Sequence, residues 1–276
     1  MSYKDILVYL DDGKSNQERI NTAFNLAKSQ QARLTAVTLS ALEPAHMIVK
    51  NETAKYNISY QEAEKRIAEF TEQATQLDIE FDTKIIDLAA GKGLRKTLAK
   101  FARNFDLVIF RQANPANKNF DLIESISSKI VVHCGRPVFF MPYIGAHHIP
   151  AKNALIAWDG TATATRAVHD SLPILKQVKE VTILVVTEGK KKTAKGELLA
   201  DDLAAHLGRH GVNANVRRTT TGSYDVPTVI LNHIAENSLD LLIMGSYGTA
   251  TLQRKVFGGV TKKILDTMIT PVIMSH

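Results

Sequence analysis

The chain has 276 residues, of which 45% are hydrophobic and 22% are charged, and it has a single cysteine. This length suits two globular domains of about 100 to 150 residues each, and one cysteine, Cys134, excludes an intrachain disulfide framework or a multi-cysteine metal site. The net charge of +6 arises from 34 basic and 28 acidic residues interspersed along the sequence, so nothing in the composition requires a nucleic-acid partner.

The chain opens with a predicted strand and has no targeting pattern. Met1 to Lys4 lead directly into the apolar residues Ile6 to Leu10, whereas a secretory signal has a basic start and a longer apolar stretch. No apolar stretch approaches the ~18 residues of a membrane-spanning helix. We therefore expect a cytoplasmic protein with no membrane partner.

Strands and helices alternate through the rest of the first half. Residues Tyr60 to Leu77 predict a polar amphipathic helix, and Gly91-Lys92-Gly93 precedes another helix. The segment Pro142 to Pro150, which also contains Gly145, predicts a linker. We therefore expect two domains, residues 1–143 and 150–276.

The second half follows the same plan. Strands are predicted at residues 153–158, 181–187, 213–219, 240–245 and 271–275, and helices at about 162–178, 196–208, 226–237 and 259–268. Pro173 should disturb the first of these helices only slightly. This alternation predicts an α/β fold with a doubly wound parallel sheet and helices on both faces. In such sheets ligands bind beyond the carboxyl ends of the strands, at a topological switch point.

The two halves are an internal duplication. The strand that ends at Asp11 matches the one that ends at Asp159, 148 residues later. Near the ends of the halves, Pro137-Val138 matches Pro271-Val272, 134 residues later. The first half therefore has 14 extra residues, which we place in the polar stretch around Glu43 to Tyr60.

A glycine motif distinguishes the second half. Met244-Gly245-Ser246-Tyr247-Gly248 closes a strand, and Gly258-Gly259 opens the next helix. Glycines let the backbone approach a ligand closely, and the free N–H groups of a helix start attract anions. The motif therefore predicts a phosphate cradle. The matching residues of the first half are Arg111, Asn114, Glu124 and Ser125. Because Glu124 would repel phosphate, and Pro115 removes an N–H, we expect the first half to have lost this site.

The glycine spacing resembles the nucleotide-binding signature of the universal stress protein family, in which a serine or threonine normally occupies the position of Gly259. The strand Ala154 to Gly160 and the strand Thr270 to Met274 extend this resemblance over the second half. It implies the adenine nucleotide alpha hydrolase-like fold in two tandem copies, with ATP as the ligand and Mg²⁺ possible through its phosphates. The implied nucleotide-binding residues are Asp159, Val186, Met244, Gly245, Gly248, Gly258, Gly259 and Val260.

The resemblance further implies a stress-response protein in which the nucleotide has a regulatory or sensory role. The alternative is a ligand-free adaptor that acts through protein–protein contacts. We identify no catalytic residue, although slow ATP hydrolysis stays open. We expect the two halves to pair around a pseudo-twofold axis through their Pro-Val strands, and a homodimer is also possible.

Other residues have alternative interpretations. Asp159 could contact the ligand or cap the helix that follows it. Trp158 could flank the base or belong to the core. We interpret Arg111 as a solvated loop arginine rather than a phosphate ligand, and the cluster Lys190 to Lys192 as a solvated loop. His206 and His210 have a metal-binding spacing, but the sequence places no third ligand beside them, so we expect no metal site.

Overall fold

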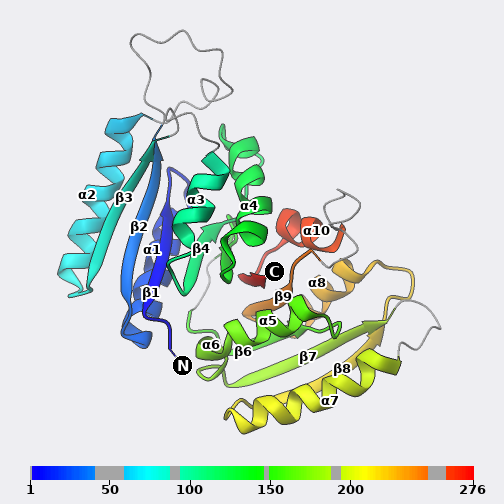
Figure 1. Cartoon of the computed structure of the whole chain (residues 1–276). Helices are drawn as coiled ribbons and strands as arrows, with labels where there is room; N and C mark the ends of the chain where they lie inside the picture. Colours follow the sequence, from blue (N-terminus) through cyan, green and yellow to red (C-terminus); the bar gives the residue numbers. More distant parts are fainter. Residues whose placement is uncertain (1, 41–58, 88–93, 146–148, 188–193, 248–258) are drawn as a thin grey trace. The chain divides into compact units, whose positions relative to one another are not determined.

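The computed structural model describes residues 2–40, 59–87, 94–145, 149–187, 194–247 and 259–276. It divides into two compact units, which we name the N-terminal unit (Ser2–Arg136) and the C-terminal unit (Pro137–His276). Strands and helices alternate in both units (Figure 1), which confirms the predicted α/β fold class. Within the described ranges, no helix is long and apolar enough to cross a membrane.

In its described residues the N-terminal unit has a parallel sheet in the order β3-β2-β1-β4. Phe24 of α1 contacts Phe70 of α2, and α3 packs against α4. In Figure 1, α2 lies on one side of the sheet, and α3 and α4 lie on the other. The elements are β1 (Asp5–Leu10), α1 (Asn16–Gln30), β2 (Arg33–Ser40), α2 (Tyr60–Gln76), β3 (Phe81–Asp87), α3 (Leu94–Ala102), β4 (Leu107–Arg111) and α4 (Phe120–Cys134).

The C-terminal unit has the sheet order β8-β7-β6-β9-β10, in which all neighbours are parallel, and β5 adds to β10 in the antiparallel direction. The elements are β5 (Val138–Met141), β6 (Asn153–Ala157), α5 (Ala162–Asp170), α6 (Leu172–Leu175), β7 (Glu180–Thr187), α7 (Ala194–Arg209), β8 (Ala214–Thr220), α8 (Val226–Glu236), β9 (Leu241–Gly245), α10 (Gly259–Thr267) and β10 (Val272–Ser275).

The strand registers of the two units agree with the duplication. Ile6 lies opposite Leu107 in the N-terminal unit, and their counterparts Ala154 and Leu241 lie opposite each other in the C-terminal unit. The extra residues of the first half fall between β2 and β3, because β2 lies 147 positions before β7 whereas β3 lies 133 positions before β8. The stretch predicted for the insertion lies almost entirely outside the described residues.

The two Pro-Val strands pair with each other, as the sequence predicts. Phe139 of β5 lies opposite Ile273 of β10, which is its own counterpart 134 residues later. Val138 and Phe140 lie opposite the counterparts of each other, Met274 and Val272. The pairing is therefore symmetric about its centre. It also explains why β5, the last strand of the first repeat, groups with the C-terminal unit.

One predicted helix is divided into two. The sequence predicts a continuous helix over about 162–178, but α5 ends at Asp170 and the short α6 begins at Leu172. Pro173 stands in the first turn of α6. Because proline has no N–H and its ring clashes with the preceding turn, it is accepted at a helix start and excluded from an interior. The effect of Pro173 is therefore larger than predicted.

Candidate functional site

A cavity lies at the carboxyl ends of β6 and β9, the two strands between which the sheet order reverses. Its volume is about 280 Å³. Residues of β6, β7 and β9 contribute to it, together with loops and helices that follow β6, β8 and β9, as expected for a switch point in a doubly wound sheet. The lining residues are Ala157, Trp158, Asp159, Thr163, Leu184, Val186, Val226, Ile230, Met244, Gly245, Tyr247, Gly259, Val260 and Thr261.

Six of the eight residues predicted to bind nucleotide line this cavity: Asp159, Val186, Met244, Gly245, Gly259 and Val260. The other two, Gly248 and Gly258, lie outside the described residues. Sequence reasoning did not assign Thr163, Leu184 or Thr261 to the site, whereas Tyr247 belongs to the predicted glycine motif. It also missed Val226 and Ile230, although their spacing of four residues puts both on one face of α8.

Asp159 accepts hydrogen bonds from Thr161 at the start of α5 but is not the N-cap of this helix. Its Oδ1 accepts hydrogen bonds from the backbone N–H of Thr161 at 3.0 Å and from the Thr161 hydroxyl at 2.7 Å. Thr161 is the N-cap, since its side chain accepts from the N–H of Ala164. The Asp159 side chain is exposed at the cavity. Asp159 is therefore not the cap of α5, and its contact with a ligand stays a prediction.

Gly245 is required by protein packing. A Cβ atom added to it would lie 2.5 Å from the backbone N of Ala164 and 2.7 Å from the carbonyl carbon of Thr163. The last residue of β9 therefore touches the first turn of α5. The sequence explains this glycine by close approach to a ligand, whereas the structure shows close approach to a helix start that itself lines the cavity.

The first turn of α10 lines the cavity through Gly259, Val260 and Thr261. The first N–H groups of a helix have no intrahelical partner, and the helix dipole favours an anion near them. No atom of the described residues lies within 4 Å of a Cβ built on Gly259. The described part of the unit therefore leaves room for a side chain here, in contrast to Gly245.

Tyr247 connects the end of β9 to α10. Its φ is 46°, in the left-handed region that non-glycine residues seldom adopt. Its backbone N–H donates to the Thr261 hydroxyl at 3.2 Å, and its side chain is buried at the cavity wall. Such backbone conformations concentrate at functional sites, where surrounding contacts hold them.

An ion pair joins α8 and α10, two helices that contribute to the cavity. Lys263 of α10 lies 2.7 Å from the carboxylate of Asp225, the N-cap of α8. Hydrogen bonds from Lys263 and from Thr228 lower the pKa of Asp225 to about 2. Because these side chains are exposed, the pair contributes little stability by itself. It does link the N-cap of α8 to α10, and both helices contribute residues to the cavity.

The corresponding place in the N-terminal unit is nearly closed, with a cavity of about 10 Å³. Arg111, the counterpart of Gly245, is only 2% exposed there and pairs with Asp11. The prediction of a solvated loop arginine is therefore wrong. The pairing was not foreseen because the two residues lie 100 positions apart.

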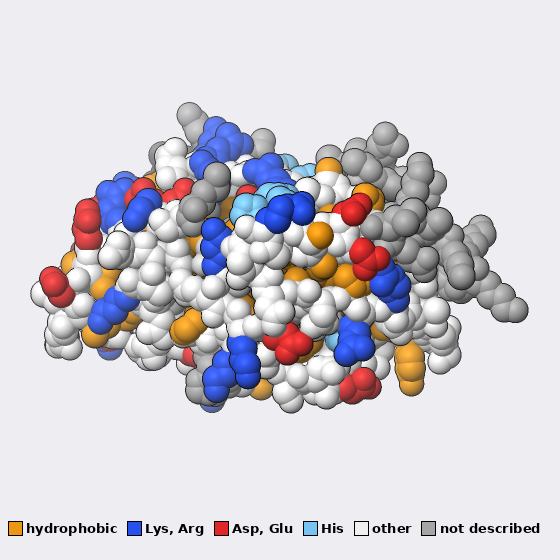
Figure 2. Space-filling model, turned by 90° about the horizontal axis from the view of Figure 1, so that it is seen from below, with side chains coloured by type: hydrophobic (Ala, Val, Ile, Leu, Met, Phe, Trp, Pro, Cys, Tyr) orange, Lys and Arg blue, Asp and Glu red, His pale blue; other side chains and the backbone are white. Residues whose placement is uncertain are grey.

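His169, His206 and His210 do not line the cavity of the C-terminal unit. His169 of α5 lies near His206 of α7, with ring centroids 5.1 Å apart, and His210 lies 4.7 Å from His206. In the described part of the chain, no group of three or more His, Cys, Asp or Glu side chains could hold a metal ion. On the face seen in Figure 2, basic and acidic side chains are interspersed, as their distribution in the sequence indicates.

Comparisons with known proteins agree with this architecture. Residues 150–276 match the model of the Universal stress protein family. Over 98% of this chain and 95% of the other, the fold is similar to that of a universal stress protein from Archaeoglobus fulgidus, with a TM-score of 0.70 and 16% identity. A functionally unknown protein from Pseudomonas aeruginosa has a TM-score of 0.67 and 12% identity, and the match covers 99% of this chain and 92% of that protein. A search of curated proteins finds no significant match.

Proposed function

We propose that the C-terminal unit binds ATP as a regulatory or sensory ligand, because residues 150–276 match the model of the Universal stress protein family and the chain shares its fold with a universal stress protein over nearly its full length. The observation that carries this proposal is the cavity at the β6–β9 switch point. It contains six of the eight residues expected to bind nucleotide. We propose a binding role in the stress response and assign no catalytic group.

The cavity offers chemically different walls to the parts of a nucleotide. Leu184, Val186, Val226 and Ile230 form an apolar region suited to the base. Asp159 supplies a carboxylate that can accept hydrogen bonds from ribose hydroxyls. The first turn of α10 supplies backbone N–H groups and a positive dipole end for the phosphates. Mg²⁺ would arrive with the phosphates, since these are its usual ligands in nucleotide sites.

Binding can be followed directly because Trp158, the only tryptophan of the chain, lines the cavity. We expect ATP with magnesium to change its fluorescence in a saturable titration. Calorimetry should give one nucleotide per chain, and mass spectrometry of nucleotide released from the purified protein should identify the physiological ligand. Two nucleotides per chain would contradict the assignment to the C-terminal unit alone.

The N-terminal unit provides the residue for a matched variant. Tyr9 is the counterpart of Ala157 and is buried where the C-terminal unit has its cavity. Ala157→Tyr should therefore fill the cavity and abolish binding. Ala205→Tyr, on the exposed face of α7, introduces the same side chain away from the cavity and should bind as the unmodified protein does. Equal binding by both variants would argue against this cavity as the nucleotide site.

The ligand-free adaptor is the second candidate, and Gly259 favours it. The family signature places a hydroxyl residue there, and a hydrogen bond to a charged group contributes about 1.5 to 3 kcal/mol. A protein that binds no nucleotide at saturating ATP and magnesium would be assigned to this class. Such a protein would then contact its partners through its surface rather than respond to a ligand in the cavity.

A further inference from the structure

The nearly closed cavity of the N-terminal unit occupies the same place in the fold as the open cavity of the C-terminal unit. Asp11 and Tyr9 at the end of β1 correspond to Asp159 and Ala157 at the end of β6. Leu39 of β2 corresponds to Val186 of β7, because Arg33 and Glu180 lie opposite equivalent residues of the neighbouring strands. All of these residues line their respective cavities. The two cavities are therefore versions of one site.

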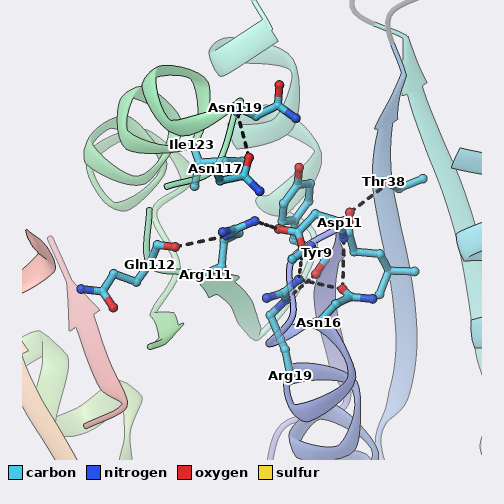
Figure 3. A network of polar contacts seen from close by, with 12 residues as sticks. Tyr9, Asp11, Asn16, Arg19, Thr38, Arg111, Gln112, Asn117, Asn119 and Ile123 are labelled. Carbon is cyan, nitrogen blue, oxygen red and sulfur yellow. Dashed lines mark hydrogen bonds and ion pairs between the residues drawn. The ribbon is translucent and has the colours of Figure 1, made fainter. Parts of the chain in front are cut away.

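Two buried arginines hold the carboxylate of Asp11 (Figure 3). Arg111 donates from Nη1 to Oδ2 of Asp11, and Nη2 of Arg19 lies 3.1 Å from Oδ1. The backbone N–H of Gly13 also donates to Oδ1, at 2.8 Å. Exposure is 0% for Arg19, 2% for Arg111 and 7% for Asp11. The carboxylate that stays exposed at Asp159 is thus fully engaged at Asp11.

Backbone and neighbouring side chains fix the two arginines in place. The Nε of Arg111 donates to the carbonyl of Gln112 at 3.1 Å, and the Nε of Arg19 donates to the carbonyl of Tyr9 at 2.7 Å. Arg19 also donates to the side chain of Asn16 at 2.7 Å. A planar guanidinium suits such a site because its donors form a rigid fork.

The described residues of the N-terminal unit leave no space for an outside molecule at this point. Tyr9 is 3% exposed and stacks on Phe110 with ring centroids 4.8 Å apart. A Cβ added to Gly13 would lie 3.0 Å from Nη1 of Arg111, so the loop after Asp11 closes tightly over the guanidinium. The remaining 10 Å³ corresponds to about one water molecule at most.

We propose that the guanidinium of Arg111 is a built-in ligand of the N-terminal unit, held by Asp11 in the site that the C-terminal unit leaves open. The N-terminal unit then depends on no external nucleotide for its stability, which leaves ligand response to the other unit. If the side chain of Arg111 is removed, the site becomes a binding site for small alkylguanidinium cations. The proposal concerns contacts within the N-terminal unit and does not depend on ATP binding elsewhere.

Chemical rescue tests this assignment. Arg111→Ala should lower the melting temperature by roughly 6 to 20 °C, because it breaks a buried ion pair. Millimolar ethylguanidinium should restore most of this loss, and ethylammonium, which has the same charge but no planar fork, should restore much less. The unmodified protein and Arg103→Ala, which lacks a more exposed arginine of the same unit, should not respond. A response of all three proteins to ethylguanidinium, or no response of Arg111→Ala, would overturn the proposal.

A second variant covers the case in which Arg111→Ala does not fold. Arg111→Lys keeps the positive charge but cannot bridge Asp11 and the carbonyl of Gln112 at once. We expect its melting temperature to lie between those of Arg111→Ala and the unmodified protein. If the alanine variant is unfolded, the melting temperature of Arg111→Lys should lie several degrees below that of the unmodified protein. A melting temperature equal to that of the unmodified protein would show that only the charge matters, and the built-in ligand would be rejected.

Discussion

The two glycines Gly245 and Gly259 belong to one sequence motif, but they should respond oppositely to the same substitution. In Gly245→Ala the new Cβ would lie 2.5 Å from the backbone N of Ala164 and 2.7 Å from the carbonyl carbon of Thr163. These distances are well below normal contact, and backbone atoms cannot rotate away as a flexible side chain can. The start of α5 would have to move away from the end of β9.

The size of the effect follows from the cost of overpacking. Forcing a methyl group into filled space costs about 1 to 3 kcal/mol, which lowers the melting temperature of a protein of this size by roughly 2 to 12 °C. In Gly259→Ala no atom of residues that the structure describes lies within 4 Å of the new Cβ. The free energy of unfolding of that variant should rise by about 0.4 to 1 kcal/mol, because alanine restricts the conformations of the unfolded chain.

Calorimetric melting of the two variants beside the unmodified protein is a direct assay. We expect the melting temperature of Gly245→Ala to be lower than that of the unmodified protein, and the melting temperature of Gly259→Ala to be equal or higher. If ATP binds as proposed, Gly245→Ala should also bind it more weakly, since Thr163 lines the cavity. Equal melting temperatures for the two variants would refute the argument that Gly245 is fixed by the packing of α5.

Three further predictions concern the two halves of the chain. Gly259→Ser should strengthen ATP binding modestly by restoring a hydroxyl donor, and titration calorimetry that finds unchanged or weaker binding would count against phosphate at this loop. Gly258→Glu introduces the glutamate that the first half has at the matching position and should abolish ATP binding. Glu124→Gly should leave the stoichiometry at one nucleotide per chain, because Arg111 still fills the N-terminal site. Asp11→Asn should lower the free energy of unfolding by about 3 to 5 kcal/mol at neutral pH, because it removes the negative charge that pairs with two buried arginines. Burial raises the pKa of Asp11, but Arg19 and Arg111 outweigh it and the pKa is lowered. Its stabilisation is therefore complete above the unfolded-state pKa and is lost as the pH falls below about 4. Urea midpoints of Asp11→Asn and the unmodified protein should thus converge on acidification, and a constant difference would contradict this.

The sequence by itself determined the architecture and the place of the candidate site. Alternating apolar strands and amphipathic helices require a parallel sheet covered on both faces, and the duplication requires two copies of it. The glycine motif after a strand then places the site at a carboxyl end, next to Asp159. These conclusions hold because hydrophobic periodicity, turn residues and the succession of strands and helices are local properties that can be read along the chain.

Only the tertiary structure decided what individual residues do at that place. Arg111 looked like a solvated arginine because its partner Asp11 lies 100 positions away. Gly245 appeared to face a ligand, and its contact with Thr163 and Ala164 arises only when β9 packs against α5. Val226 and Ile230 joined the site because α8 covers β7. Burial, ion pairing and steric fit are properties of residues brought together by folding, and sequence distance does not reveal them.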